Sequence, residues 1–277
     1  MDFYFQRQYR GPLKAVILDW AGTTVDYGSF APVAVFLKLF EKEGVQISAD
    51  DVRSGMGLMK KDHLRTILSR PIVAQTWRET HHGADAQASD INRLFEQFVP
   101  MQLASVRDYA EPIPGLLGSI EDLRERGMKI GSTTGYIQSM MAELGPEAAR
   151  NGYTPDSIVC PDEVPAGRPF PWMCYENAAR LGVYPMQAML KVGDSLPDIE
   201  EGLNAGMWSV GLALTGNLLG LVESEVKALP PAQLDAERER ITTTLYQAGA
   251  HLVIDGIWDL PRAVVEIGRR LAAGERP

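Results

Sequence analysis

The sequence predicts an α/β protein with a doubly wound, mostly parallel sheet and an inserted helical domain. Short apolar runs alternate with segments of helical periodicity through most of the chain, which is the pattern of a parallel sheet covered by helices. One interval breaks this alternation, because residues 30–105 show helical spacing and almost no strand pattern. Since this interval is too long for a loop, we expect a helical cap over a Rossmann-like core.

Six apolar segments are the expected strands. They are residues 14–18, 128–132, 157–160, 188–193, 208–213 and 251–255. Helical stretches separate most of them, near residues 116–126, 137–149, 172–182, 197–205 and 258–272. Because a connection between parallel strands crosses back over the sheet, these helices are expected to cover its faces.

The inserted segment contains its own helices. An apolar helix is predicted over residues 33–40, and Ser48-Ala-Asp-Asp51 is typical of a capping box that begins the next helix. Further helices are expected at about residues 60–69, 72–82 and 87–105. The hinges to the core are expected near residues 27–28 and around residues 111–115.

These expectations divide the chain into three parts. Residues 1–13 form an N-terminal extension expected to be disordered. Residues 14–28 and 106–277 form the α/β core, and residues 29–105 form the cap. Residues 214–250 contain a loop and helices without an evident chemical motif.

Composition and charge narrow the classes of function. The net charge of −9 argues against a nucleic-acid surface and favours an acidic enzyme with a local anion site. No apolar run approaches the length that spans a membrane. The 2 cysteines, Cys160 and Cys174, are interpreted as buried packing residues, and so few cysteines favour a reducing cytoplasm.

Four expected strand ends carry groups suited to phosphate chemistry. In an open parallel sheet, ligands bind beyond the carboxyl ends of the strands. Asp19 closes the first strand, where a carboxylate is a candidate covalent nucleophile. The later strand ends supply, in order, Thr134 and Gly135, then Arg168, and then Asp194 with Asp198 one helical turn further on.

Two carboxylates beside a phosphate suit Mg²⁺, and Arg168 can neutralise phosphate charge. Each residue alone has a simpler explanation. A strand-end aspartate or threonine can cap a helix, paired acids can complement a helix dipole, and an arginine can form a surface ion pair. The order of the groups across four successive strand ends favours one shared site.

These groups, in this order, resemble the motifs of the haloacid dehalogenase superfamily, whose members form an aspartyl-phosphate intermediate. The superfamily usually has a lysine where Arg168 stands, a departure that keeps the charge. A closer resemblance, over nearly the whole chain from Lys14, is to the phosphonoacetaldehyde hydrolase family. The segments that carry it are Asp19–Gly28 (DWAGTTVDYG), Met56–His63 (MGLMKKDH), Gly131–Tyr136 (GSTTGY), Val164–Tyr175 (VPAGRPFPWMCY) and Lys191–Asp194 (KVGD).

The resemblance implies hydrolysis of the carbon–phosphorus bond of phosphonoacetaldehyde to acetaldehyde and phosphate, in 2-aminoethylphosphonate degradation. It implies a Schiff base on Lys60 of the cap. It also implies a Mg²⁺ site formed by the Asp19 carboxylate, the Ala21 carbonyl and Asp194, with Asp198 behind these ligands. A homodimer formed through the caps is implied as well, and residues 33–40 are a candidate surface unless they are cap core.

The absence of an acid at Ala21 and the presence of Lys60 are expected to have the same chemical reason. Many enzymes of this layout carry a second acid two residues after the nucleophile, where this chain has Ala21. A phosphate ester releases an alkoxide, which needs a proton from such an acid. Breaking a C–P bond instead leaves a carbanion, and a protonated imine can accept its electrons as an enamine. With an imine on Lys60, the acid has no purpose.

The remaining candidates have two interpretations each. Lys60 must be neutral to attack an aldehyde, and we expect burial under the cap and cations such as Lys61 to lower its pKa. His63 shares the helix face of Lys60 and is predicted to shuttle protons, unless it only caps or pairs on the cap surface. Met56 either fills a core or lies at the domain interface, and Tyr136 either reaches the substrate or packs.

Two alternatives stay open. The first is a phosphomonoesterase or phosphomutase of the same fold, against which Ala21 and Lys60 argue. The second is a non-catalytic, phosphate-binding relative, which four intact strand-end groups make less expected.

Overall fold

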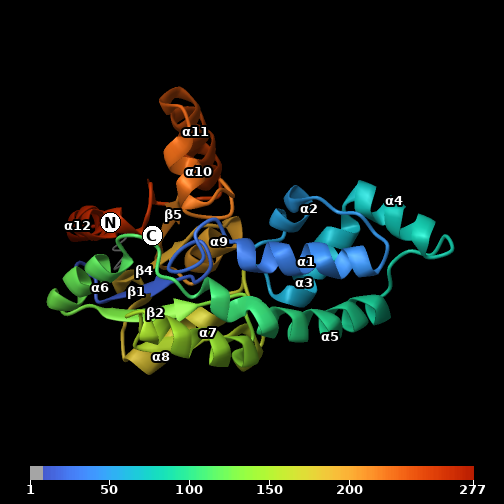
Figure 1. Ribbon diagram of the computed structural model, residues 1–277. Helices are drawn as coiled ribbons and strands as arrows, with labels where there is room; N and C mark the ends of the chain where they lie inside the picture. The colour runs from blue at the N-terminus through green and yellow to red at the C-terminus, as the bar shows by residue number, and fades with distance from the viewer. Residues whose placement is uncertain (1–8) are drawn as a thin grey trace, which may run out of the picture.

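The computed structural model describes residues 9–277 and contains a six-stranded parallel sheet covered by helices (Figure 1). The strand order is β3-β2-β1-β4-β5-β6, so β1 lies inside the sheet and later strands add on both of its sides. The strands are β1 Ala15–Leu18, β2 Lys129–Thr133, β3 Ser157–Val159, β4 Met189–Gly193, β5 Trp208–Leu212 and β6 Leu252–Ile254. The predicted doubly wound α/β architecture is confirmed.

Helices follow the strands of the core as the alternating pattern predicts. They are α6 Leu116–Glu125, α7 Gln138–Arg150, α8 Trp172–Leu181, α9 Leu196–Asn204, α10 Glu223–Ala228, α11 Pro231–Gln247 and α12 Leu260–Ala272. Alternate residues of β1 belong to different apolar clusters, with Val16 and Leu18 in one and Ile17 in the other. Both faces of the sheet are therefore buried, which explains the unbroken apolar run of its central strand.

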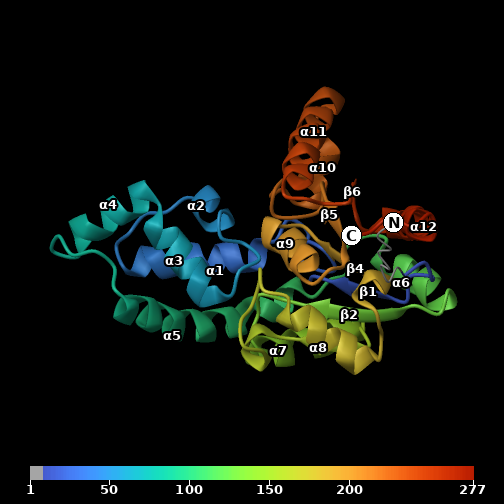
Figure 2. The same ribbon diagram turned by 180° about the vertical axis from the view of Figure 1, so that it is seen from behind.

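The expected helical insert lies beyond one end of the sheet (Figure 2). Its helices are α1 Phe30–Lys42, α2 Ala49–Arg53, α3 Lys60–Ser69, α4 Pro71–Thr80 and α5 Ala88–Ser105. The predicted capping box is present, since the Ser48 side chain accepts from the Asp51 amide and Asp51 accepts from the Ser48 amide. On α1, Phe36, Leu39 and Phe40 are fully buried, so the apolar face of this helix is cap core.

The two crossings between core and insert lie side by side. Val25 forms a β-bridge with Pro112, and the amide of Ile113 donates to the Thr24 carbonyl at 2.9 Å. Just beyond the first crossing, the Asp26 carboxylate accepts from the backbone amides of Phe30 and Ala31 at the start of α1. The exact domain bounds stay a prediction, and the predicted extension at residues 1–13 falls mostly on residues 1–8, outside the described part of the chain.

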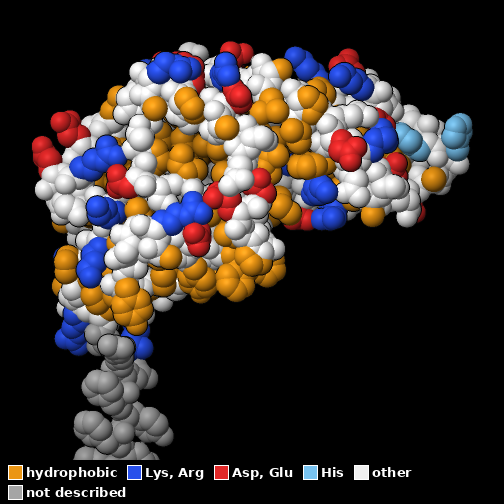
Figure 3. All heavy atoms as spheres, turned by 90° about the horizontal axis from the view of Figure 1, so that it is seen from below, with side chains coloured by type: hydrophobic (Ala, Val, Ile, Leu, Met, Phe, Trp, Pro, Cys, Tyr) orange, Lys and Arg blue, Asp and Glu red, His pale blue; other side chains and the backbone are white. Residues whose placement is uncertain are grey.

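The surface carries charges of both signs. In Figure 3, blue and red side chains are interspersed over the face that it shows, on the core and on the cap. Within residues 9–277, none of the helices combines the length and the hydrophobicity needed to cross a membrane.

Candidate active site

A small cavity lies where the cap meets the carboxyl ends of β1, β2 and β4. Its volume is about 20 Å³, which is room for about one water molecule, so the cap is closed on the core. Nine of the predicted site residues line it: Asp19, Ala21, Met56, Lys60, Thr134, Gly135, Tyr136, Arg168 and Asp194. Ser29, Pro32 and Gly57 complete the lining, whereas the predicted residues His63 and Asp198 lie outside it.

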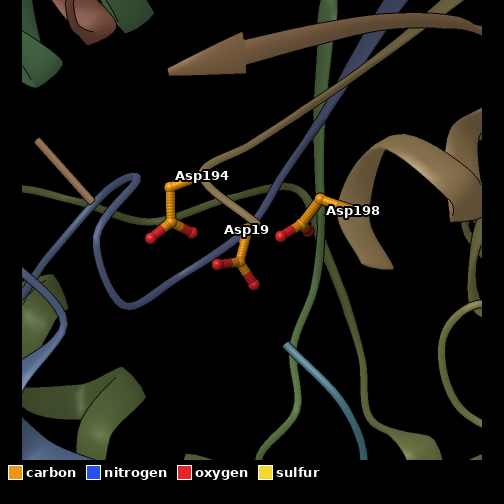
Figure 4. A group of neighbouring side chains, drawn as sticks. All are labelled: Asp19, Asp194 and Asp198. Atoms are coloured by element: carbon orange, nitrogen blue, oxygen red, sulfur yellow. The ribbon is translucent and has the colours of Figure 1, made fainter. Parts of the chain in front are cut away.

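Three aspartates gather at the ends of β1 and β4 (Figure 4). One carboxylate oxygen from each of Asp19, Asp194 and Asp198 lies within 4.8 Å of the others, and all three side chains are buried. Asp19 and Asp194 meet because β1 and β4 are paired in parallel, which brings their carboxyl ends to the same edge, and Asp198 joins them from the first turn of α9. Burial, together with the charges of Asp19 and Asp198, raises the pKa of Asp194 well above its usual range.

Arg168 forms buried ion pairs with two aspartates of this cluster and with Glu201. Its guanidinium lies 2.6 Å from Asp19, 3.1 Å from Asp198 and 3.0 Å from Glu201. Burial opposes its charge, but these carboxylates outweigh burial and hold the pKa of Arg168 well above its usual range. Burial raises the pKa of Asp19, an effect that Arg168 opposes and Asp198 reinforces. The surface ion pair considered for Arg168 is thus replaced by a buried one.

Two buried charges behind Arg168 were not among the predicted site residues. The Lys191 ammonium lies 2.5 Å from Asp198 and 3.5 Å from Glu201, and all three side chains are fully buried. A signal for Lys191 is present in the sequence, because a lysine inside an apolar strand needs a buried partner. Glu201 follows Asp198 on α9, but its role emerges only when α9 packs against β4 and β5.

The charge balance of this cluster fits a divalent cation. When ionised, four buried carboxylates (Asp19, Asp194, Asp198 and Glu201) face three buried cations (Arg168, Lys191 and, across the cavity, Lys60), which leaves a net negative charge. Asp198 is already engaged by Lys191, Ser195 and Arg168. Asp19 and Asp194 border the cavity, and carboxylate oxygens are preferred ligands of hard cations.

The last residue of β2 supplies a threonine to the ion network, and the loop after β2 supplies another to the cavity. Thr134 lines the cavity, and its hydroxyl oxygen accepts from the Tyr136 amide at 3.0 Å. Thr133, which was not predicted, accepts from Arg168 and donates to Glu201. Gly135 lets the cap approach closely, because a Cβ at this position would lie 2.9 Å from the Leu58 carbonyl oxygen.

Lys60 begins α3 and projects into the cavity from the cap, so it faces Asp19 from the opposite domain. Its ammonium nitrogen lies 5.1 Å from the centre of the Tyr136 ring. Burial, reinforced by Arg168 and opposed by Asp19, lowers the pKa of Lys60 to about 8. The expected contribution of burial is present, but the neighbouring cation is Arg168. Lys61 instead donates to Asn92.

His63 lies inside the cap rather than on its surface. Its Nε2 lies 2.6 Å from the Val52 carbonyl oxygen, and its ring packs against Phe36 with centroids 4.4 Å apart. Burial, with a contribution from Lys60, lowers the pKa of His63 to about 3, so the ring is neutral at pH 7. Its Nδ1 has no hydrogen-bond partner.

Comparisons with known proteins agree with this geometry. The model of the haloacid dehalogenase-like hydrolases matches residues 13–206. A phosphonoacetaldehyde hydrolase of Syntrophobacter fumaroxidans is 48% identical over 275 residues, covering 99% of each chain. A phosphonoacetaldehyde hydrolase of Bacillus cereus is 46% identical over 258 residues, covering 93% of this chain and 97% of its own.

Solved structures show the same relation. A phosphonoacetaldehyde hydrolase-like protein from Oleispira antarctica superposes with a TM-score of 0.97 at 40% identity, and the match covers 100% of both chains. A β-phosphoglucomutase from Clostridium difficile shares only the fold, with a TM-score of 0.65 at 18% identity over 94% of this chain and 99% of its own. The chain therefore belongs to the haloacid dehalogenase-like hydrolases and, within them, to the phosphonoacetaldehyde hydrolase family.

Proposed function

We propose that this protein hydrolyses the C–P bond of phosphonoacetaldehyde to acetaldehyde and phosphate, in the degradation of 2-aminoethylphosphonate. One observation carries the proposal beyond the family relation. Lys60, buried and with a lowered pKa, faces the Asp19 carboxylate across a closed cavity, while Ala21 occupies the position of the usual second acid. An amine that forms an imine and a carboxylate that accepts a phosphoryl group are what C–P cleavage needs.

The reaction begins at Lys60. The neutral amine attacks the aldehyde carbon, and loss of water leaves a protonated imine. An Asp19 oxygen then forms a bond to phosphorus while the C–P bond breaks, and its electron pair moves into the imine to give an enamine. Water hydrolyses the aspartyl phosphate to phosphate and free Asp19. Protonation of the enamine carbon and hydrolysis of the imine release acetaldehyde and regenerate Lys60.

The residues around these two groups have distinct proposed roles. Arg168 holds one oxygen of Asp19 and supplies positive charge beside the phosphonate. Thr134 and the Gly135 amide bind phosphonate oxygens, and Met56 and Tyr136 border the aldehyde end of the cavity. The closed cap excludes bulk water from the imine and the acyl phosphate.

His63 is proposed to relay protons while the imine forms and breaks down. It lies three residues after Lys60 on α3, and its unpartnered Nδ1 is free to accept a proton. Nε2 keeps its own proton on the Val52 carbonyl oxygen, so Nδ1 would take a proton only transiently and return it, because burial disfavours the charged ring.

The metal is proposed to be Mg²⁺, held by the Asp19 and Asp194 carboxylates and the Ala21 carbonyl, with Asp198 behind them. When bound, Mg²⁺ would offset the negative charge of the carboxylates and the phosphonate. The support is the net negative charge of the buried cluster and its all-oxygen donor set.

The setting and assembly are also proposals. Cys160 and Cys174 are both buried free thiols, which supports a reducing cytoplasm. A homodimer through the cap domain is proposed from the family relation, and because the apolar face of α1 is cap core, the dimer must use other cap residues. The molar mass measured by light scattering after size-exclusion chromatography tests the dimer, and a monomeric mass would contradict it.

Substrate comparison tests the proposed reaction against its alternatives. We expect phosphate release from phosphonoacetaldehyde that is lost in Lys60→Arg, because a guanidinium forms no imine at neutral pH. Release from sugar phosphates alone would favour a phosphomonoesterase or phosphomutase. Release from neither substrate, with phosphate binding retained, would favour a non-catalytic relative.

A further inference from the structure

The loop after β5, residues 215–220, contacts the segment after β1, the hinge and the Asp194 carboxylate. Thr215 donates from its hydroxyl to the Gly22 carbonyl at 2.8 Å and accepts at its carbonyl from the Gly28 amide at 2.8 Å. The Asn217 amide donates to Asp194 Oδ2 at 2.6 Å. A Cβ on Gly216 would collide with the Asp194 carboxylate, so the loop backbone lies directly against this side chain.

The same loop is bound by one arginine of the cap. Arg53, at the end of α2, donates to the Asn217 side-chain oxygen at 3.2 Å and to the Gly220 carbonyl at 3.3 Å. It also donates to the Gly28 carbonyl at the hinge, at 2.8 Å. In return, the Asn217 side-chain amide donates to the Arg53 carbonyl at 3.1 Å. The contact between Arg53 and Asn217 is thus reciprocal and joins the two domains.

Asn217 therefore holds the cap through its side chain and Asp194 through its backbone. Because its side chain is 5% exposed, the Arg53 contact is shielded from competing water. Opening the cap would remove Arg53 from Asn217 and Gly220. The loop would be held only from the core, as at its Thr215 end, where the hydroxyl donates to the Gly22 carbonyl. The Asp194 carboxylate would then lose the element that fixes its orientation.

We propose that Arg53 and Asn217 are positioning residues that couple closure of the cap to cation binding at Asp194. Neither side chain lines the cavity: Asn217 acts through the loop that orients Asp194, and Arg53 acts through the same loop and through its positive charge, which is attracted to Asp194. Because binding linkage is reciprocal, a cation at Asp194 favours the closed cap to the same extent that the closed cap favours the cation. This inference rests on the proposed metal site and adds a structural route by which cation binding there would stabilise the closed cap.

The test measures Mg²⁺ affinity by calorimetry in the substrate-free, full-length protein. We expect Arg53→Met and Asn217→Ala each to weaken Mg²⁺ binding by on the order of tenfold. The double variant should be no weaker than Arg53→Met alone, because Arg53→Met already removes the side-chain contact with Asn217 that Asn217→Ala removes. Arg53→Lys should keep more of the Mg²⁺ affinity than Arg53→Met, since an ammonium can still donate to one of the carbonyls of Gly28 and Gly220. Arg65→Met is the matched control, because Arg65 pairs with Asp62 within the cap.

A second readout follows the cap itself. Mg²⁺ should protect the hinge segments from limited proteolysis in the unsubstituted protein and in Arg65→Met, but not in Arg53→Met. Unchanged Mg²⁺ affinity in folded Arg53→Met or Asn217→Ala, or additive losses in the double variant, would overturn the coupling. Failure of the unsubstituted protein to bind Mg²⁺ would instead overturn the proposed metal site.

Discussion

The most informative perturbation is a wedge between the cap and the core at Gly135. A Cβ there would lie 2.9 Å from the Leu58 carbonyl oxygen and 3.4 Å from that of Gly57, both in the cap. Gly135→Val adds two further methyl groups, so the cap loop must retreat and water can reach Lys60. Since burial is the main cause that lowers the pKa of Lys60 to about 8, this pKa should rise toward 10.5.

The expected magnitude follows from the fraction of neutral amine. With a pKa of about 8, about a tenth of Lys60 is neutral at pH 7 and about nine-tenths at pH 9. A lysine restored to 10.5 has roughly 300-fold less neutral amine at pH 7. The loss should shrink about five- to sevenfold for each unit of pH between 8 and 10, because the unsubstituted lysine is then largely neutral while the exposed one still gains neutral amine.

The assay is the pH dependence of kcat/KM for phosphate release from phosphonoacetaldehyde, which reports the ionisations of the free enzyme. The ascending limb should bend near pH 8 in the unsubstituted protein and at higher pH in Gly135→Val. Gly118→Val on α6 is the control, since no atom lies within 4 Å of a Cβ at that position. A loss in Gly135→Val that is the same at every pH would refute the role of burial.

Three further results are expected. Arg168→Met should lower the free energy of unfolding by about 3–5 kcal/mol in urea titrations, because it leaves buried carboxylates uncompensated; a loss below 1 kcal/mol would contradict this account. Asp194→Asn should abolish activity yet raise the unfolding free energy of the metal-free protein, because an ionised Asp194 is disfavoured by burial and its neighbours; a less stable variant would count against that electrostatic explanation. Chelation should stop turnover until Mg²⁺ is restored, and full activity in excess chelator would exclude the proposed metal site.

Much of the fold was predictable because local patterns and layer architecture agree. Apolar runs separated by amphipathic helices predict parallel strands, and parallel strands bring their carboxyl ends to one edge. For the same reason, Asp19, Thr134 and Asp194 were expected to meet, and they line one cavity. The inserted helices were expected because residues 30–105 carry helical spacing without strand alternation.

The missed contacts join segments far apart in the sequence. Arg53 and Asn217 are 164 residues apart and carry no local motif, so only the docked cap brings them together. Asp26 was also not predicted as a capping residue. It lies several residues before α1 and reaches the helix start from a left-handed backbone conformation at φ 55°. Spacing placed His63 on the face of Lys60, but packing against Phe36 placed its ring inside the cap.

The proposed reaction depends on an imine between Lys60 and the substrate aldehyde. The direct measurement is borohydride reduction of the protein with phosphonoacetaldehyde, followed by mass mapping of the modified peptide. We expect an irreversible label on Lys60, loss of activity in proportion to labelling, and no such label in Lys60→Arg. A label on another lysine, or full turnover with no label at all, would contradict it.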